Sequence, residues 1–100
     1  MREDRQRLDK WLWFARFAKS RTLATRLVQS GYVRINGQRV DNAAKAIAVG
    51  DVVTIALVRT TAVVRVKDLG ERRGPAPEAR LLYTELGRDD PPLASEEPDR

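Results

Sequence analysis

The chain is 100 residues long and contains neither cysteine nor histidine. It can therefore form no disulfide, it offers neither thiolate nor imidazole to a metal, and it lacks the commonest general base. We expect a single non-enzymatic domain without a cofactor. The net charge is +5, and residues 1–40 hold ten Lys and Arg against three Asp and Glu. This concentration of positive charge predicts a surface for a polyanion, with an ordinary solubilising surface as the alternative.

The sequence has no segment typical of a membrane protein. Its apolar runs fall short of the roughly 18–20 residues needed to span a bilayer. The charged residues 1–7 are followed by no apolar stretch of the signal-peptide type. We therefore expect a cytoplasmic protein without a membrane partner.

Two amphipathic helices are predicted in the first thirty residues, after a flexible lead over residues 1–6. Apolar residues then recur at intervals of three and four, which indicates a helix over residues 7–17. Ser20 is a favourable N-cap for a second helix over residues 21–30, and Gly31 stands where a left-handed C-terminal cap belongs. With a turn of two or three residues between them, the helices would form a helix-turn-helix-like unit.

The apolar spacing then changes to two, which is typical of strands. The dipeptide Asn36-Gly37 is a strong hairpin signal, because a type I′ turn needs positive φ at both central residues. Further β-rich runs would complete a small antiparallel sheet, so the predicted fold class is α+β. Strands are expected at residues 33–35, 38–40, 52–58 and 61–66.

The domain built from these elements, residues 7–69, is followed by a segment of different composition. Gly and Pro near its start interrupt regular structure, and Pro77 could open a short helix that reaches Leu86. We expect residues 70–86 to pack on the domain as a C-terminal extension. The acidic residues 87–100 are expected to be disordered.

The hairpin register gives a specific prediction about charge. With residues 36 and 37 in the turn, Arg34 lies directly opposite Arg39 on one face of the hairpin. Like charges in this position are destabilising unless something lies between them. A phosphate would explain the arrangement, and the alternative is that both side chains extend into water.

The second helix carries most of the other candidate site residues. Its N-terminus offers free backbone N–H groups and the positive end of the helix dipole, both of which favour a phosphate. Basic and hydroxyl side chains surround it, although any one of them could belong to an ordinary solvated face. The predicted RNA-binding residues are Arg7, Lys10, Arg16, Lys19, Ser20, Arg21, Thr22, Thr25, Arg26, Arg34, Asn36, Gly37 and Arg39.

Three other residues of the first helix have predicted roles. Trp11 lies on the apolar stripe and is expected in the core. Trp13 lies off the stripe, and it either packs under residues 75–82 or stacks on an RNA base. We expect packing, because a domain this small needs apolar cover. Asp9 is expected to be structural, pairing with arginines or capping the helix.

Several of these elements together resemble a known RNA-binding domain. The order and spacing of four segments resemble the S-four RNA-binding domain, named for a protein of the small ribosomal subunit. These segments are residues 7–13, 20–28, 31–37 and 50–53. More narrowly, residues 9–17 and 72–83 are similar to the heat shock protein 15 family, which is bacterial and ribosome-associated.

The resemblance implies a fold and a function. The fold is the alpha-L motif, in which two helices pack on a small antiparallel sheet. The implied partners are structured ribosomal RNA and the large ribosomal subunit, with transfer RNA as an additional candidate. The implied role is the rescue or recycling of subunits that carry a nascent chain on transfer RNA, and the family's name implies a part in a stress response.

Two other function classes stay open at this point. Related domains are fused to RNA-modifying enzymes, but only about forty residues follow the resembling segment here, and Asp9, Asp41 and Asp51 form no recognisable acid–base pair. The second class is an adaptor that binds structured RNA or DNA in general, without ribosome specificity. DNA readers with a helix-turn-helix usually dimerise. No dimerisation segment is visible, so we expect a monomer.

Overall fold

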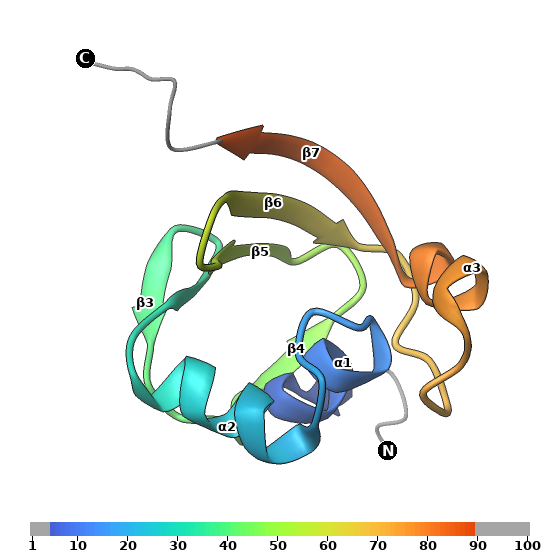
Figure 1. Ribbon diagram of the computed structural model, residues 1–100, viewed down its shortest axis with the longest axis horizontal. Coiled ribbons are helices and arrows are strands. Elements are labelled where there is room, and N and C mark those ends of the chain that lie inside the picture. The colour runs from blue at the N-terminus through green and yellow to red at the C-terminus, as the bar shows by residue number, and fades with distance from the viewer. Residues whose placement is uncertain (1–4, 90–100) are drawn as a thin grey trace.

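The computed structural model describes residues 5–89 and has two helices on one side of a curved antiparallel sheet (Figure 1). The helices are α1 (Leu8–Phe14), α2 (Arg21–Gln29) and α3 (Ala76–Ala79), and a 3-10 turn, η1 (Arg80–Leu82), follows the last of them. The strands are β1 (Arg5–Arg7), β2 (Val33–Ile35), β3 (Gln38–Val40), β4 (Ala46–Ala48), β5 (Val52–Ala56), β6 (Thr61–Val66) and β7 (Tyr83–Asp89). The predicted α+β class is confirmed.

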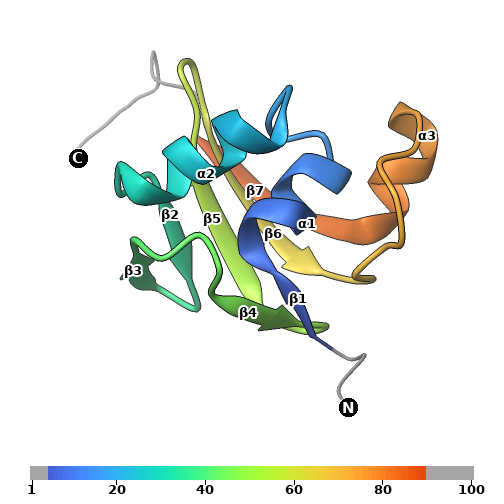
Figure 2. The same ribbon diagram turned by 90° about the horizontal axis from the view of Figure 1, so that it is seen from below.

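The main sheet has the strand order β3-β2-β5-β6-β7, and every neighbouring pair is antiparallel. Strands β1 and β4 pair separately in a two-stranded sheet. Figure 2 shows α1 and α2 lying over the main sheet, with the β1–β4 pair at the end of the molecule where α1 begins. The main sheet thus supports the helices, and α2 lies next to the β2–β3 hairpin.

The hydrophobic core lies between the helices and the sheet. Trp11 is fully buried in it, as predicted, and its indole Nε1 donates a hydrogen bond to the Asp68 carbonyl oxygen at 3.0 Å. This bond satisfies the one polar atom that a buried tryptophan side chain carries. The other fully buried large apolar side chains are Leu8, Leu12, Val28, Val33, Ile47, Val53, Ile55, Val64 and Val66.

Helix α1 ends earlier than predicted, at Phe14 rather than Phe17. Arg16 has a φ of +66°, its N–H donates to the Trp13 carbonyl, and the Phe17 N–H donates to the Leu12 carbonyl. These two bonds form a Schellman motif, which ends a helix at a left-handed residue. The turn brings the centre of the Phe17 ring to 4.9 Å from the centre of the Tyr83 ring. Aromatic packing with the start of β7 thus favours this turn over a further turn of helix. Residues 15–20 therefore join the two helices, which is a longer connection than the predicted two or three residues.

Helix α2 agrees with its predicted limits. The Ser20 hydroxyl accepts a hydrogen bond from the Leu23 N–H at 3.1 Å, so Ser20 is the N-cap. The helix ends at Gln29, within one residue of the prediction, and Gly31 follows with a φ of +84°. The predicted left-handed cap at Gly31 is confirmed.

The predicted hairpin and its register are also confirmed. Asn36 and Gly37 have φ values of +51° and +86°, as a type I′ turn requires. Arg34 is the direct cross-strand partner of Arg39. The predicted strand over residues 61–66 is observed, and the one predicted over 52–58 ends at Ala56.

The flexible lead predicted over residues 1–6 is wrong at its end, because Arg5 and Gln6 belong to strand β1. Arg5 pairs with Ala48 and Arg7 with Ala46, and the Leu8 N–H continues the ladder to the Lys45 carbonyl. A strand made of Arg, Gln and Arg carries no apolar alternation, so its pairing with a distant strand leaves no local signal. The rest of the lead, residues 1–4, lies outside the described residues.

The C-terminal part also differs from its prediction. The helix expected to reach Leu86 ends at Ala79, and the 3-10 turn after it ends at Leu82. From Tyr83 the chain forms β7, which pairs along β6 with an irregularity between Val63 and Val64. Pairing satisfies the backbone groups of β6 that would otherwise lie at the edge of the sheet.

The predicted disordered tail, residues 87–100, is therefore also wrong at its start, because residues 87–89 belong to β7. The remainder, residues 90–100, lies outside the described residues. The boundary between a packed extension and an acidic tail thus falls later in the chain than the composition suggested.

Candidate nucleic-acid interface

The side of α2 that faces α1 is organised by Asp9, whose side chain is only 2% exposed. Arg7 binds its carboxylate with two hydrogen bonds, from Nε at 3.1 Å and from Nη2 at 3.0 Å. The Thr25 hydroxyl lies 3.1 Å from the same carboxylate, and Arg21 Nη2 lies 3.8 Å from it. The predicted structural role of Asp9, pairing with arginines, is what the structure shows.

The pKa of Asp9 reflects two opposing effects. Burial raises the pKa, but hydrogen bonds from Arg7 and Thr25 and the positive charges of Arg7 and Arg21 lower it by more. The pKa of the carboxyl therefore lies below its usual value. The ionised carboxylate in turn holds two arginines at the start of the basic surface.

The exposed side of α2 carries Thr22, Arg26 and Gln29 at intervals of four and three residues, so they form one ridge. The N–H groups of Arg21 and Thr22, in the first turn, have no intrahelical acceptor. With Ser20 as N-cap, the ridge therefore begins at the positive end of the helix dipole.

On its other side, α2 borders a shallow groove of about 500 Å³. Lys19 and Arg26 are exposed at this groove, and within residues 5–89 neither side chain takes part in a hydrogen bond or ion pair. The groove is lined by Phe17, Ala18, Lys19, Leu23, Arg26, Leu27, Ser30, Tyr32 and Leu57.

The β2–β3 hairpin adds two exposed arginines beyond the C-terminal end of α2. Arg34 Nη1 lies 3.4 Å from the Gly37 carbonyl oxygen, a long hydrogen bond within the hairpin. The Arg39 guanidinium lies against the backbone of Gly31. Both cations thus stay on the surface, with Arg39 next to the end of α2.

Asn36 has internal partners for both polar atoms of its side chain. Its Oδ1 accepts a hydrogen bond from the Val52 N–H at 2.9 Å, and its Nδ2 donates to Asp51 Oδ1 at 3.2 Å. These bonds tie the hairpin turn to the turn before β5. Gly37 has an open position beside it, with no atom within 4 Å of a β-carbon placed there.

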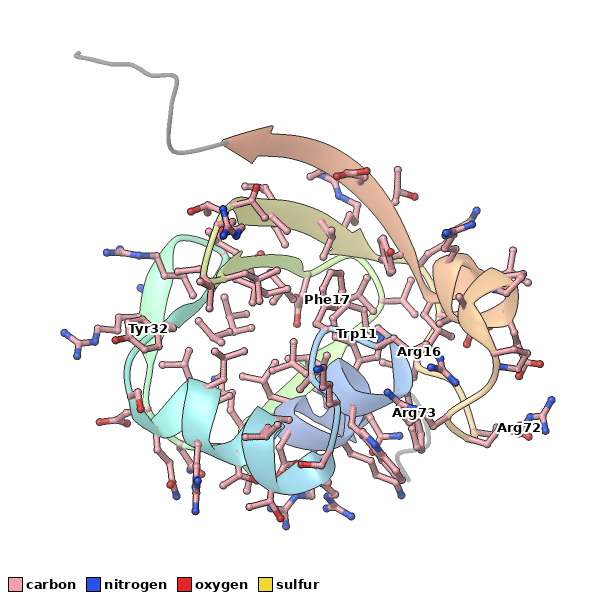
Figure 3. All side chains as sticks on the ribbon, in the orientation of Figure 1. Trp11, Arg16, Phe17, Tyr32, Arg72 and Arg73 are labelled. Carbon is pink, nitrogen blue, oxygen red and sulfur yellow. The ribbon has the colours of Figure 1, made fainter. Side chains whose placement is uncertain are left out.

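Two other predicted site residues belong to α1 and its C-terminal turn. Lys10 Nζ lies 5.6 Å from the centre of the Phe14 ring, a cation–π distance. Arg16 Nε donates to the Gly74 carbonyl oxygen at 2.7 Å, so this side chain is directed to the C-terminal segment. Figure 3 shows Arg16 beside Arg73, on the opposite side of the molecule from Tyr32. The structure thus separates Arg16 from the groove and the hairpin.

Trp13 is half-buried and packs against the C-terminal segment. The Arg73 guanidinium lies 5.8 Å from the centre of the Trp13 ring, and Arg73 Nε donates to the Trp13 carbonyl oxygen at 3.1 Å. Arg73, just before the predicted segment 75–82, therefore covers part of the ring. Stacking on an RNA base stays an untested alternative for the part of the ring that is still exposed.

Two exposed apolar residues in this region, Tyr32 and Leu23, were not among the predicted site residues. They are 55% and 45% exposed, although both lie among basic side chains. A signal existed for Tyr32, because it follows the C-terminal cap Gly31 and precedes the first strand residue. The backbone of a residue at such a junction is held by hydrogen bonds to both the end of the helix and the neighbouring strand.

Acidic side chains are scarce in the segment that carries α2 and the hairpin. Between residues 5 and 40 the sequence has nine Lys and Arg and one acidic residue, Asp9. Because Asp9 is buried, no exposed carboxylate from this part of the chain offsets the positive charge. Within residues 5–89 no group of three Asp, Glu, His or Cys could hold a metal ion, and no helix is long and apolar enough to cross a membrane.

Comparison with known proteins places the chain in a family. Residues 6–53 match the S4 domain, which is the S-four domain of the sequence resemblance. A solved trimeric structure of heat shock protein 15 from Vibrio cholerae superposes with a TM-score of 0.78 at 39% identity, covering 82% of each chain. The chain belongs to the heat shock protein 15 family.

Curated sequences agree with this assignment. The chain is 44% identical over 79 residues to heat shock protein 15 of Escherichia coli K12, covering 79% of this chain and 59% of that one. It is 40% identical over 85 residues to the Haemophilus influenzae homolog, covering 85% of this chain and 64% of the relative. The chain thus spans about 59–64% of the length of these heat shock protein 15 relatives.

Proposed function

We propose that this protein is a non-enzymatic RNA-binding protein that grips structured RNA with α2 and the β2–β3 hairpin. The observation that carries the proposal is the charge of this surface. The one acidic residue between residues 5 and 40 is buried, and five cations lie on α2, just before it or on the hairpin, namely Lys19, Arg21, Arg26, Arg34 and Arg39. A surface of this kind attracts phosphates and repels basic partners.

The geometry supports phosphate contacts at two separate places. Arg21 and the capped N-terminus of α2 form the first, with free backbone N–H groups in the first turn. Arg34 and Arg39 form the second, as direct cross-strand neighbours on an exposed hairpin. A duplex backbone that runs past both places would neutralise charges that otherwise repel each other.

Membership of the heat shock protein 15 family supports a more specific target. We propose that the RNA is ribosomal RNA on the large ribosomal subunit, that transfer RNA is an additional partner, and that the protein acts as a cytoplasmic monomer. The proposed role is the rescue or recycling of subunits that carry nascent-chain transfer RNA.

The test is cosedimentation with purified large and small ribosomal subunits at low salt. The test variant is Arg21→Ala/Arg34→Ala, which removes one cation from each proposed phosphate site. The matched control is Arg65→Ala/Lys67→Ala, which removes the same charge from exposed positions in β6 and just after it. The folding of both variants is checked by circular dichroism.

Binding to the large subunit that the test variant loses and the control keeps supports the proposal. Binding to neither subunit contradicts the ribosomal target. A competition experiment then distinguishes ribosome-specific binding from general nucleic-acid binding. Folded ribosomal RNA should displace a ribosome-specific protein, and duplex DNA should displace it poorly. Equal displacement by both would favour an adaptor without ribosome specificity.

A further inference from the structure

The groove beside α2 differs from the rest of the basic surface, because its walls are apolar. Leu23 and Leu27 come from α2, Phe17 and Ala18 from the segment before it, and the remaining wall from the residues after α2 and β5. Leu23 and Tyr32 leave about half of their side-chain surface in water. Exposed apolar side chains that cluster in this way on a small domain indicate a contact surface.

The edge of the groove is positively charged. Lys19 lies just before α2 and Arg26 lies in its second turn, and both line the groove. None of the lining residues, all of which belong to the described part of the chain, is acidic. An occupant that combines a flat apolar group with negative charge is therefore complementary to the groove, whereas an apolar peptide would leave both cations unpaired.

Tyr32 is positioned to stack on such an occupant. Its backbone is held on both sides, by a hydrogen bond from its N–H to the Leu27 carbonyl and by one from the Ala56 N–H to its own carbonyl. Within residues 5–89 its ring packs against no other aromatic ring. Figure 3 shows Tyr32 at the outside of the fold, away from Trp11 in the interior. An exposed aromatic side chain on a backbone that is held in this way is suited to stacking.

We propose that the groove binds one unpaired nucleobase of the bound RNA, stacked on Tyr32 and packed against Leu23, with Lys19 and Arg26 on the adjoining phosphates. This inference rests on the proposed RNA-binding function and adds to it a preference for RNA with a bulged or unstacked base. The groove volume of about 500 Å³ is within the range of sites that hold small organic groups, about 300–1,000 Å³.

The geometry of α2 makes the two kinds of contact compatible. The ridge of Thr22, Arg26 and Gln29 faces solvent between the Asp9 side and the groove side of the helix. A backbone lying along the ridge could therefore place a phosphate at Arg26 and turn the adjacent base into the groove. Arg26 belongs to both the ridge and the groove, so it links the two.

The experiment compares two RNA hairpins of identical stem and loop, one fully paired and one with a single bulged 2-aminopurine. Fluorescence anisotropy at low salt gives the affinity, and the 2-aminopurine emission reports stacking of the bulged base. The variants are Tyr32→Ala, Tyr32→Phe and, as a control, Leu81→Ala, which removes an apolar side chain that is 61% exposed near the opposite end of the fold.

The expected result is that the bulged hairpin binds about 5- to 100-fold more tightly than the paired one, as base–aromatic stacking predicts. Its emission should be quenched on binding. Tyr32→Ala should lose both effects while keeping the affinity for the paired hairpin, and Tyr32→Phe and Leu81→Ala should keep both. If the wild type and every variant bind the bulged and the paired hairpin equally well, the inference is wrong and the proposed function still stands.

Two further outcomes also decide against it. Binding to neither hairpin contradicts the proposed function together with the inference. If sedimentation velocity shows that Tyr32→Ala changes the association state of the protein while the hairpin preference is unaltered, the groove is an interface between copies of this chain instead of a base site.

Discussion

The guanidinium of Arg39 lies against Gly31, with Nε 2.6 Å and Cζ 2.8 Å from the position that a β-carbon on Gly31 would occupy. Gly31 ends α2, and Arg39 lies in β3, so this contact joins the helix to the hairpin. The C-terminal end of a helix carries partial negative charge, which favours a cation there. The contact therefore fixes one hairpin arginine relative to α2.

The first prediction compares Gly31→Ala with Gly37→Ala. Both glycines have nearly the same φ, +84° and +86°, so an alanine meets a similar backbone penalty of about 1 kcal/mol at either position. At Gly37 the new methyl group meets no atom, whereas at Gly31 it displaces Arg39. Because Arg39 is an exposed and flexible side chain that can shift, urea denaturation should show that Gly31→Ala lowers the free energy of unfolding only slightly more than Gly37→Ala does.

A double-mutant comparison isolates the cause. In a background with Arg39→Ala, the two glycine substitutions should lower the free energy of unfolding by similar amounts, because the colliding side chain is gone. A difference that persists in this background would show that another neighbour of Gly31 is responsible.

The second prediction concerns Asp9→Asn and pH. The asparagine keeps the shape of the side chain but loses the charge that binds Arg7 and Arg21, so the free energy of unfolding at neutral pH should fall by about 1–2 kcal/mol. Because the folded-state pKa of Asp9 is lowered, its contribution is full above the unfolded value of about 3.9 and is lost as the pH falls through the folded value. Urea denaturation over a pH series measures this directly.

The wild-type and Asp9→Asn curves should therefore converge in acid below about pH 4. Asp41→Asn is the control, because Asp41 is exposed, and it should leave the free energy of unfolding nearly unchanged across the series. A constant gap between wild type and Asp9→Asn down to the lowest pH would mean that the lost packing, and not the charge, causes the destabilisation.

How much of this site could be predicted from sequence depended on the range of the interactions. Ser20, Gly31 and the Asn36-Gly37 turn act within a few residues, and the structure confirms all three. The Arg34–Arg39 pairing followed from the turn alone, because two-residue turns fix the register of a hairpin.

Long-range contacts were not predictable in the same way. The early end of α1 depends on Phe17 meeting Tyr83, sixty-six positions along the chain, and strand β1 depends on a distant partner strand. Arg16 was expected at the RNA surface because of its charge, yet its guanidinium bonds to Gly74. The charge of a side chain predicts that it will form a polar contact, but the partner depends on the fold.

The third prediction tests this role of Arg16. Arg16→Ala keeps the strained left-handed backbone and loses the hydrogen bond to Gly74, so the free energy of unfolding should fall by about 1–2 kcal/mol. Arg16→Gly loses the same bond but relieves the strain, so it should recover about 1 kcal/mol relative to alanine. Thermal unfolding followed by circular dichroism measures the order of the three proteins.

Limited proteolysis supplies the control for the Arg16 series. If the bond to Gly74 holds the segment before α3, both variants should be cleaved near residues 70–75 faster than wild type, regardless of their difference in unfolding free energy. Cleavage at the wild-type rate in both would show that Arg73, which bonds to Trp13, is sufficient to hold this segment.

The fourth prediction concerns the salt dependence of RNA binding. With about five phosphate contacts, the slope of log affinity against log salt should be about −4 for an RNA duplex. Arg21→Ala/Arg34→Ala removes two of these contacts, so its slope should be shallower by about 2, whereas Arg65→Ala/Lys67→Ala should keep the wild-type slope. Fluorescence anisotropy with one paired RNA hairpin at several salt concentrations gives all three slopes. The same slope in both double variants would mean that net charge attracts the RNA without a defined site, and an affinity independent of salt would exclude the phosphate contacts at α2 and the hairpin.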